Sequence, residues 1–333
     1  MNNLSKQEAL IDECVKQGDT ESAVRVLFDL IVAFAKQKNF TKAEALRERL
    51  FDIDAMALTE IIKSAEIIEE EKSETLDQKH LDIWSDLYDE LSTEETHALY
   101  FALQEQSYDT NETIFKQGKK NGRLYFINQG QLKLIHNQKG SERLLQTIGP
   151  GSVVGDDTFF SITVCTSSLV TLSRVKLSFL EKDSLATWQD EFPSLSSKLQ
   201  DYCKKLRKSH EAATPVDRRV HERISVPGHV MYQILDASGK PIGGKVFKGD
   251  LSDVSAGGAS FFITTNHKNA RLLLGRKLKI KLMIQPSGEE QPFQQKGQII
   301  GVINQLYNDY SIHMKFDNLL PQKEIVALKK YAS

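Results

Sequence analysis

Three arginines that precede a predicted β-strand are the residues of this sequence best suited to binding an anion. Arg218, Arg219 and Arg223 lie within six positions in the stretch VDRRVHERISV, residues 216–226. A guanidinium group is a planar fork of N–H donors that bridges phosphate oxygens with two parallel hydrogen bonds. The same fork matches the O6 and N7 atoms of guanine, and its flat face stacks on a base. The cluster therefore indicates a site for a phosphate or a guanine.

A second polar cluster, DVSAGG at residues 253–258, could supply the complementary groups. The Asp253 carboxylate can accept the N–H donors on the opposite edge of a guanine. Ser255 is small enough for close approach and can hydrogen-bond a ligand or the backbone. Gly258 permits a turn that a Cβ would block. The two clusters together suit a ligand that carries both phosphate and guanine.

Each cluster also has a plainer interpretation. The arginines could form a solvated basic face that pairs with Glu222 or with the acidic segment 67–78, and such surface pairs contribute about 0–1 kcal/mol. DVSAGG could be an ordinary turn, because Asp, Ser and Gly favour turns. The occurrence of both clusters, in this order, favours the binding site.

The elements that position these clusters are predicted from the alternation of hydrophobic and polar residues. After residue 224, short alternating runs such as HVMYQIL, ASFFITT and YSIHMKF recur at regular spacing, and QKEIVALKKYA has the pattern of a helix. This organisation is typical of a small antiparallel barrel. The arginines then lie where a linker enters the barrel, and DVSAGG lies between two strands.

The region 214–333 resembles a PilZ domain, the bacterial receptor module for cyclic di-GMP. Arg219 and Arg223 match the RxxxR motif of that family. The residues that match its DxSxxG motif are Asp253, Ser255 and Gly258. The two motifs are about one hairpin apart, as they are in the family.

The resemblance implies a fold and a set of contacts. We expect residues 209–223 to form a linker that carries RxxxR, and residues 224–333 to form a six-stranded antiparallel β-barrel. The resemblance assigns Arg219 and Arg223 to phosphate and guanine contacts, and Asp253 and Ser255 to the base. Arg218 stands where many family members have a further basic residue, so we include it as an auxiliary contact.

Residues 80–208 have the pattern of another β-domain. A helical segment that ends near Leu103 is followed by short alternating runs, and glycines at 118, 130, 149, 151 and 155 fall between them as turns require. The stretches ETIFKQGKKNGRLYFINQGQLKL and IGPGSVVGDDTFF and the helical segment PSLSSKLQDYCKKLRK make this region similar to a cyclic-nucleotide-binding domain of the Crp/Fnr type. We expect an antiparallel β-barrel or jelly roll with flanking helices.

The phosphate site that this second resemblance implies is altered in the present sequence. The family holds the cyclic phosphate at a short helix after a Gly-Glu pair, with an arginine nearby. Here the pair reads Gly155-Asp156, and spacing places Cys165 at the arginine position. An anion desolvated without its cation is costly. We therefore expect this domain to be degenerate and to serve docking or dimerisation, and binding of cyclic AMP or cyclic GMP is the alternative.

Residues 1–75 are predicted to be helical. Hydrophobic residues from Ala23 to Ala35 fall on one helical face, and NFTKAEALRERLFDI repeats the pattern after a break. This part resembles one tetratricopeptide-type hairpin. The whole chain is thus predicted to be a multidomain α+β protein.

Composition narrows the function classes. The 333 residues have a formal net charge of −2, and no DNA-reading helix pair follows the first β-domain. Both features argue against a DNA-binding protein. Three widely separated cysteines form no zinc motif and fit a reducing cytoplasm. No stretch has the character of a signal peptide or of a membrane span. We expect a cytoplasmic protein.

Catalytic signatures are absent from the sequence. There is no GxSxG, no GxxxxGK followed by Ser or Thr, and no HExxH. We therefore predict a chain that is not an enzyme and that needs no cofactor and no metal.

The leading hypothesis is a bacterial receptor in which cyclic di-GMP, bound at the two motifs, reorients the PilZ domain relative to the other β-domain and so controls a protein partner of unknown identity. The alternatives are a dual sensor that also binds cyclic AMP or cyclic GMP, and an interaction scaffold that binds no ligand. A leucine-rich stripe in residues 195–206 allows a homodimer.

Overall fold

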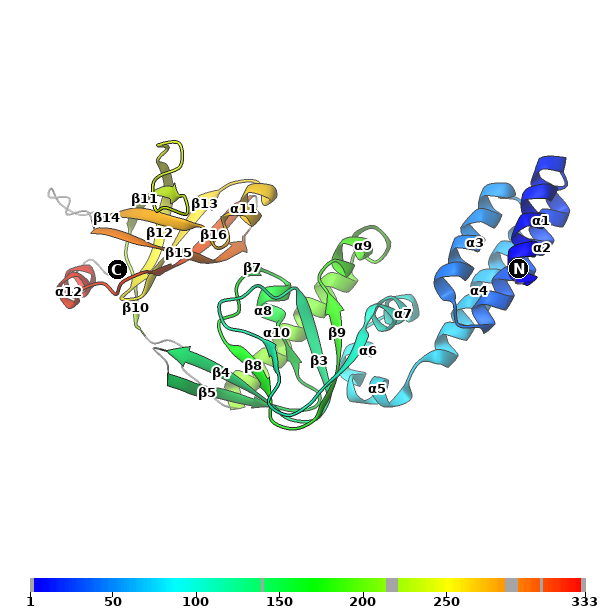
Figure 1. Ribbon diagram of the computed structural model, residues 1–333, viewed down its shortest axis with the longest axis horizontal. Helices are drawn as coiled ribbons and strands as arrows, with labels where there is room; N and C mark the ends of the chain where they lie inside the picture. The colour runs from blue at the N-terminus through cyan, green and yellow to red at the C-terminus, as the bar shows by residue number, and fades with distance from the viewer. Residues whose placement is uncertain (1–2, 139–140, 214–220, 285–292, 306–307, 331–333) are drawn as a thin grey trace. The chain divides into compact units, whose positions relative to one another are not determined.

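The computed structural model describes residues 3–138, 141–213, 221–284, 293–305 and 308–330 (Figure 1). These residues form two compact units, 1–101 and 102–333. The helices are α1 (Asn3–Gln17), α2 (Thr20–Lys36), α3 (Phe40–Ile53), α4 (Leu58–Thr75), α5 (Gln78–Ile83), α6 (Ser85–Tyr88), α7 (Thr93–Ala102), α8 (Asp156–Phe159), α9 (Ser184–Glu191), α10 (Leu195–Ala213), α11 (His267–Leu273) and α12 (Gln322–Lys329). The strands are β1 (Gln104–Tyr108), β2 (Thr113–Phe115), β3 (Arg123–Gln129), β4 (Leu132–Gln138), β5 (Ser141–Ile148), β6 (Val153–Val154), β7 (Ile162–Thr163), β8 (Ser168–Thr171), β9 (Val175–Glu181), β10 (Arg223–Ser225), β11 (Gly228–Leu235), β12 (Phe247–Ser255), β13 (Gly258–Thr264), β14 (Lys277–Ile284), β15 (Phe293–Asn304) and β16 (Asp309–Phe316).

The first unit is helical, as the sequence predicts. Asp19 and Asn39 cap α2 and α3, because their side chains accept hydrogen bonds from backbone N–H groups in the first turn of each helix. The hydrophobic face predicted between Ala23 and Ala35 is buried against α1, α3 and α4. Burial of this face, rather than helix propensity, supplies most of the stability of such a bundle.

The helix α7 begins with a capping box. The Ser92 N–H donates to the Glu95 carboxylate at 3.0 Å, and the Glu95 N–H donates to Ser92 Oγ at 3.2 Å. In the next turn, His97 lies with Nδ1 2.6 Å from Glu69 Oε2 and Nε2 3.2 Å from Ser73 Oγ, both on α4. A buried histidine therefore joins α7 to α4.

The second unit begins with a β-sandwich. One four-stranded sheet has the order β1-β9-β3-β6 and the other has the order β2-β8-β4-β5, with antiparallel pairs throughout. Their inner faces share a core of residues such as Tyr125, Leu132 and Leu177. The helices α9 and α10 follow β9, as the resemblance to Crp/Fnr proteins implies. This sandwich with its flanking helices is the predicted cyclic-nucleotide-binding fold.

The rest of the second unit is a closed barrel. Six antiparallel strands follow one another in the order β12-β11-β14-β15-β16-β13, and β13 pairs with β12 to close the ring. The predicted six-stranded antiparallel barrel is confirmed. Two short strands are added to this ring, because β10 pairs with β12 and β7 of the sandwich pairs with β15.

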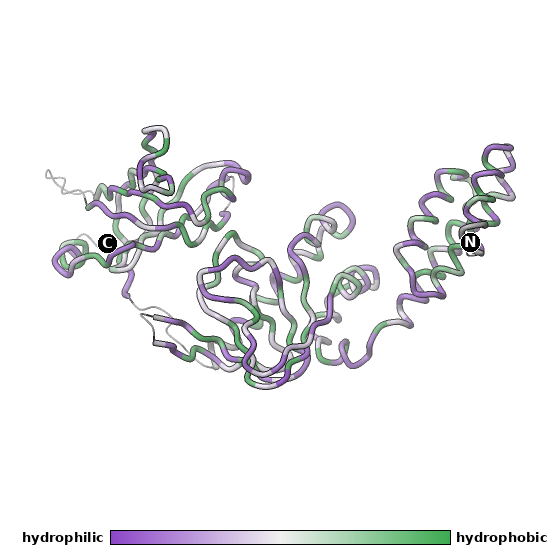
Figure 2. Tube along the Cα trace, in the orientation of Figure 1, coloured by the Kyte–Doolittle hydropathy of each residue, from purple (hydrophilic) through white to green (hydrophobic). Residues whose placement is uncertain are grey.

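Alternation along the strands explains why the barrel closes. Hydrophobic and hydrophilic residues alternate along these strands (Figure 2). On β13 and β16 the inward residues are Ala259, Phe261, Ile312 and Met314, all buried in one core. The outward positions between them carry the polar side chains of Ser260 and His313.

Two further expectations can be compared with the described chain. None of its helices is both long enough and apolar enough to cross a membrane. The helix α10 extends to Ala213 and β10 begins at Arg223, so helix occupies the first part of the range predicted to be a linker.

Candidate functional site

The strand pair β10 and β12 brings the second arginine of RxxxR to the DxSxxG motif. In the antiparallel register Arg223 lies opposite Ser255, and Ser225 lies opposite Asp253. The guanidinium Nη1 of Arg223 is 3.8 Å from Asp253 Oδ2. The side chains are 44% and 23% exposed, so the pair is partly solvated and its contribution to folding stability is at most about 1 kcal/mol. Arg223 is therefore held close to the motif by a contact that a phosphate could replace.

The turn between β12 and β13 fixes the rest of the motif. Ser255 pairs with Gly258, and Ser255 Oγ donates a hydrogen bond to the Gly258 carbonyl at 3.3 Å. A Cβ built on Gly258 would lie 2.3 Å from the carbonyl oxygen of Met314 on β16. Glycine at 258 is thus required by close packing of the β13 and β16 backbones rather than by a special turn conformation.

Linker residues lie against the same turn. The His221 ring lies over Gly257, because its Cδ2 is 3.0 Å from the position that a Cβ on Gly257 would take. Glu222 contacts Lys329 of α12 through a 2.5 Å ion pair. One carboxylate that could have neutralised the arginines is therefore held by α12. Arg218 and Arg219 fall outside the described residues, and their predicted contacts stay predictions.

His313, which belongs to neither sequence motif, also lies on this face. His313 on β16 lies with Nδ1 3.0 Å from Ser260 Oγ and with Nε2 3.3 Å from Ser311 Oγ. Burial lowers the pKa of His313, and the positive charge of Arg223 lowers it further, while Asp253 raises it. The imidazole of His313 therefore favours its neutral form, and its pKa depends on the charges of both Arg223 and Asp253. Its outward position in the strand YSIHMKF was the available sequence clue.

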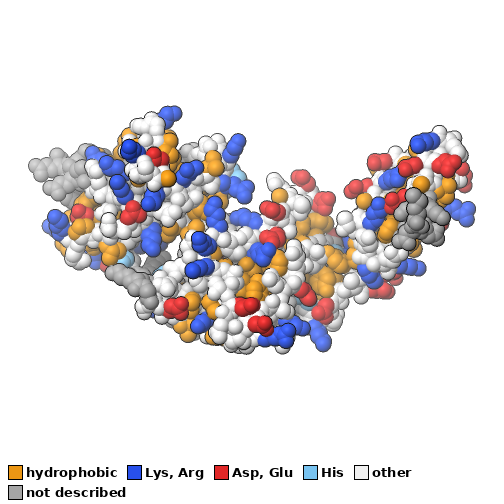
Figure 3. Space-filling view, in the orientation of Figure 1, with side chains coloured by type: hydrophobic (Ala, Val, Ile, Leu, Met, Phe, Trp, Pro, Cys, Tyr) orange, Lys and Arg blue, Asp and Glu red, His pale blue; other side chains and the backbone are white. Residues whose placement is uncertain are grey.

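The arrangement suits the binding of an anionic ligand. A half-exposed guanidinium, a carboxylate, a hydroxyl and a closely packed turn lie together on the outer face of the barrel. Across residues 217–331, 17 lysines and arginines face 10 aspartates and glutamates, and basic side chains are numerous on the barrel face in Figure 3. Such a positive field favours the approach of an anion. Within the described part of the chain, no cluster of His, Cys, Asp and Glu could hold a metal ion.

The candidate phosphate site of the sandwich has a different character. Gly155 has a φ of 95° and precedes the short helix α8, as the resemblance implies. The carboxylate of Asp156 contacts the Arg207 guanidinium of α10 at 2.5 Å, and the Asp156 side chain is 19% exposed. The acidic side chain of the Gly155-Asp156 pair is therefore already engaged by an arginine of the same chain.

Cys165 occupies the position where the resemblance places an arginine, and it is 3% exposed. Its N–H donates to the Lys119 carbonyl and its carbonyl accepts from the Gly118 N–H, both at 2.8 Å. Burial, and then the charge of Asp157, raise the pKa of the thiol to about 12. The side chain is thus a buried neutral group that offers no cation to a phosphate.

This environment predicts the reactivity of the cysteines. Because only the thiolate is an effective nucleophile, Cys165 and the buried Cys203, whose pKa is also raised by burial, should resist alkylation in the folded protein. The half-buried Cys14 should react first. Pulse labelling with iodoacetamide, read by peptide mass spectrometry with and without urea, measures the order. Labelling of Cys165 as fast as Cys14 in native buffer would contradict the assignment.

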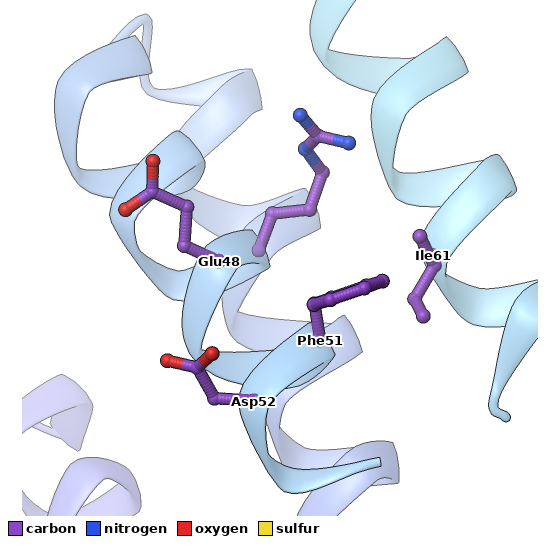
Figure 4. Close-up of a pocket in the computed structure, with 5 residues that line it drawn as sticks. Glu48, Phe51, Asp52 and Ile61 are labelled. Atoms are coloured by element: carbon purple, nitrogen blue, oxygen red, sulfur yellow. The ribbon is translucent and has the colours of Figure 1, made fainter. Parts of the chain in front are cut away.

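A hollow on the first unit is unrelated to these sites. It lies beside α3 and α4 and is lined by Arg47, Glu48, Phe51, Asp52 and Ile61 (Figure 4). Phe51 is 55% exposed and the charged residues carry both signs. The hollow contains none of the motif residues.

Comparisons with known proteins agree with the two β-domains. The family model of the cyclic nucleotide-binding domain matches residues 105–191, and that of the PilZ domain matches residues 217–331. A segment of 140 residues is 29% identical to the CRP-like cAMP-activated global transcriptional regulator of Mycobacterium tuberculosis. The match covers 41% of this chain and only 60% of that relative's length.

Solved structures also give matches. The N-terminal domain of a transcriptional regulator from Streptomyces coelicolor is 27% identical, with 38% of this chain and 91% of that one covered and a TM-score of 0.33. The catabolite activator protein of Thermus thermophilus is 23% identical, with 38% and 61% covered and a TM-score of 0.32. The family models, together with the sandwich and the closed barrel, establish that this chain carries a cyclic nucleotide-binding domain followed by a PilZ domain.

Proposed function

We propose that this chain is a non-enzymatic cytoplasmic receptor for cyclic di-GMP, which binds at the entrance to its PilZ domain. The observation that carries the proposal is the position of Arg223, which lies beside Asp253 and opposite Ser255. This places a phosphate-binding fork next to an acceptor for a guanine edge, so one ligand that carries both groups can engage them together. Arg218 and Arg219 would add cations from the linker.

The proposed output is a change in how the PilZ domain is held. Arg219 lies in the segment between α10 and β10, and Arg223 is the first residue of β10. A ligand that bridges these arginines to Asp253 and Ser255 would draw this segment onto the barrel. The ligand shifts an arrangement only if its affinity differs between the arrangements. A ligand that contacts linker and barrel residues together meets that condition. A protein partner would then recognise the arrangement that the ligand stabilises.

Calorimetric titration of the full chain with cyclic di-GMP tests the proposal. We expect saturable heat, and we expect Arg219→Ala combined with Arg223→Ala to abolish it, because a phosphate loses its charged partners. The absence of heat in the wild type, or unchanged affinity in the double variant, would refute the proposal.

A dual sensor is the second candidate, because one relative is named as cAMP-activated. Two observations oppose it: Cys165 is buried and neutral, and Asp156 is engaged by Arg207. We expect no binding of labelled cyclic AMP at concentrations where cyclic di-GMP saturates. Tight binding would support the dual sensor. No binding of either nucleotide would favour a scaffold that binds no ligand.

A further inference from the structure

A row of directly opposed residues crosses the outer face of the PilZ barrel. The strand registers pair Asp253 with Ser260, Ser260 with His313, His313 with Gly301, and Gly301 with Thr163. Opposed residues in antiparallel strands project their side chains from the same face. The row therefore begins at the cyclic di-GMP motif on β12 and ends on β7, which belongs to the cyclic nucleotide-binding domain.

Side-chain contacts connect the members of the row. Ser260 is 3% exposed, and its hydroxyl lies 3.0 Å from His313 Nδ1. A Cβ on Gly301 would lie 3.5 Å from His313 Cδ2 and 3.3 Å from Thr163 Cγ2. The missing side chain at Gly301 thus lets the histidine and the threonine lie on either side of one narrow space.

Both register shifts of the closed barrel fall on this row. One lies between Leu251 and Asp253, and the other lies between Ile299 and Gly301. A bulge leaves an extra residue without a ladder partner and re-aims its neighbours. The carbonyl of the extra residue Ile300 accepts a hydrogen bond from the Val164 N–H at 3.0 Å. The second bulge is therefore the point where the barrel binds the other domain.

The pairing of β7 with β15, called the joint below, involves residues of both domains. β7 continues along the edge of β15 beyond the place where β14 stops, since β14 pairs with β15 only up to Gln298. Ile162 packs on the barrel core, and Cys165, next to Val164, is tied by two hydrogen bonds to residues 118 and 119. The joint is therefore adjacent in the chain to Cys165, the position where the resemblance places the phosphate-binding arginine.

We propose that the row from Asp253 to Thr163 couples the cyclic di-GMP site to the β7–β15 joint. Ligand binding then stabilises the joint and so affects the cyclic nucleotide-binding domain. The inference rests on the proposed function and adds the residues through which ligand binding affects the other domain. A ligand that engages Arg223 and Asp253 fixes the β10–β12 edge and the charges that face His313. His313 and Ser260 pass this constraint to Gly301. Because coupling free energies are reciprocal, weakening the joint must weaken ligand binding.

Hydrogen exchange of the full chain measures the joint, and calorimetry measures the site. We expect cyclic di-GMP to slow exchange of the peptide that contains Val164. We expect Ile162→Asp, which places a charge in the joint but leaves every PilZ residue unchanged, to weaken cyclic di-GMP binding about fivefold or more. Leu172→Asp is the matched control, because Leu172 is a 42% exposed leucine of the same domain, and its affinity should stay within about twofold.

A second variant tests the same joint from the PilZ side. Gly301→Val fills the space between His313 and Thr163 and should also weaken binding, and circular dichroism with thermal unfolding checks that each variant is folded. Absence of wild-type binding overturns both the receptor function and the coupling. Binding that leaves Val164 exchange unchanged or faster, or an unchanged affinity in folded Ile162→Asp, overturns the coupling alone.

Discussion

Replacement of Arg223 by glutamate is expected to lower the affinity for cyclic di-GMP by at least about 100-fold. Removing a charged hydrogen-bond partner of a phosphate costs about 1.5–3 kcal/mol, which is roughly 10- to 150-fold in affinity. The new carboxylate would add repulsion toward the phosphates and would stand beside Asp253, which now lies 3.8 Å from the guanidinium. Calorimetric titration measures the loss.

Lys279→Glu provides the control of equal charge change. Lys279 is an exposed residue of β14, a strand that does not contact β10 or carry a motif residue. The affinity of the Lys279→Glu variant for cyclic di-GMP should fall only by the small, salt-dependent amount that a change in the protein's overall electrostatic field produces. The Arg223–Asp253 pair is partly solvated, so Arg223→Glu should remain folded with a loss of about 1 kcal/mol. Equal losses of affinity in the two variants would mean that Arg223 makes no specific contact.

The parts of this fold that local chemistry dictates could be predicted from the sequence. Period-two alternation predicted the strands of both β-domains. The caps at Asp19, Asn39 and Ser92 are equally local, because each joins residues three positions apart. The motif geometry was also accessible. RxxxR and DxSxxG lie at a strand start and a strand end, and the register brings Arg223 to Ser255.

The parts that depend on long-range register could not be predicted. His313 lies at the site only because β16 pairs with β13 in the register that puts it opposite Ser260. A bulge between Ile299 and Gly301 in the β15–β16 pairing puts the same histidine opposite Gly301. A one-residue bulge leaves no pattern in a strand that stays hydrophobic on one face. Nor could the pairing of β7 with β15 be foreseen, because a two-residue strand carries no periodicity.

The sandwich shows a further limit. Spacing identified Cys165 as the residue at the arginine position, and the structure makes it a buried thiol. The ion pair of Asp156 with Arg207 joins residues 51 positions apart, and no local sequence pattern around either residue predicts it. A missing arginine can therefore be identified in the sequence, whereas the partner of a remaining acidic residue is identified only in the fold.

Gly258→Ala is expected to destabilise the PilZ domain by about 2–3 kcal/mol. The added Cβ would lie 2.3 Å from the Met314 carbonyl oxygen, and backbone rather than a movable side chain lies in its way. β13 and β16 must then separate where Gly258 pairs with Lys315, and forced overpacking of this kind costs about 1–3 kcal/mol or more. For a domain of this size, the melting temperature should fall by about 10 °C or more.

Thermal unfolding followed by circular dichroism and calorimetry measures this shift, and Gly122→Ala is the matched control. Gly122 lies in the cyclic nucleotide-binding domain, and the atom nearest to an added Cβ is 4.0 Å away. That variant should melt within about 2 °C of the wild type, since a substitution without steric conflict changes stability by less than about 0.5 kcal/mol. Because Ser255 Oγ donates to the Gly258 carbonyl, Gly258→Ala should also weaken cyclic di-GMP binding at temperatures where the barrel is still folded. A Gly258→Ala protein that melts with the wild type would show that the β13–β16 contact yields without cost, and the motif glycine would then need another explanation.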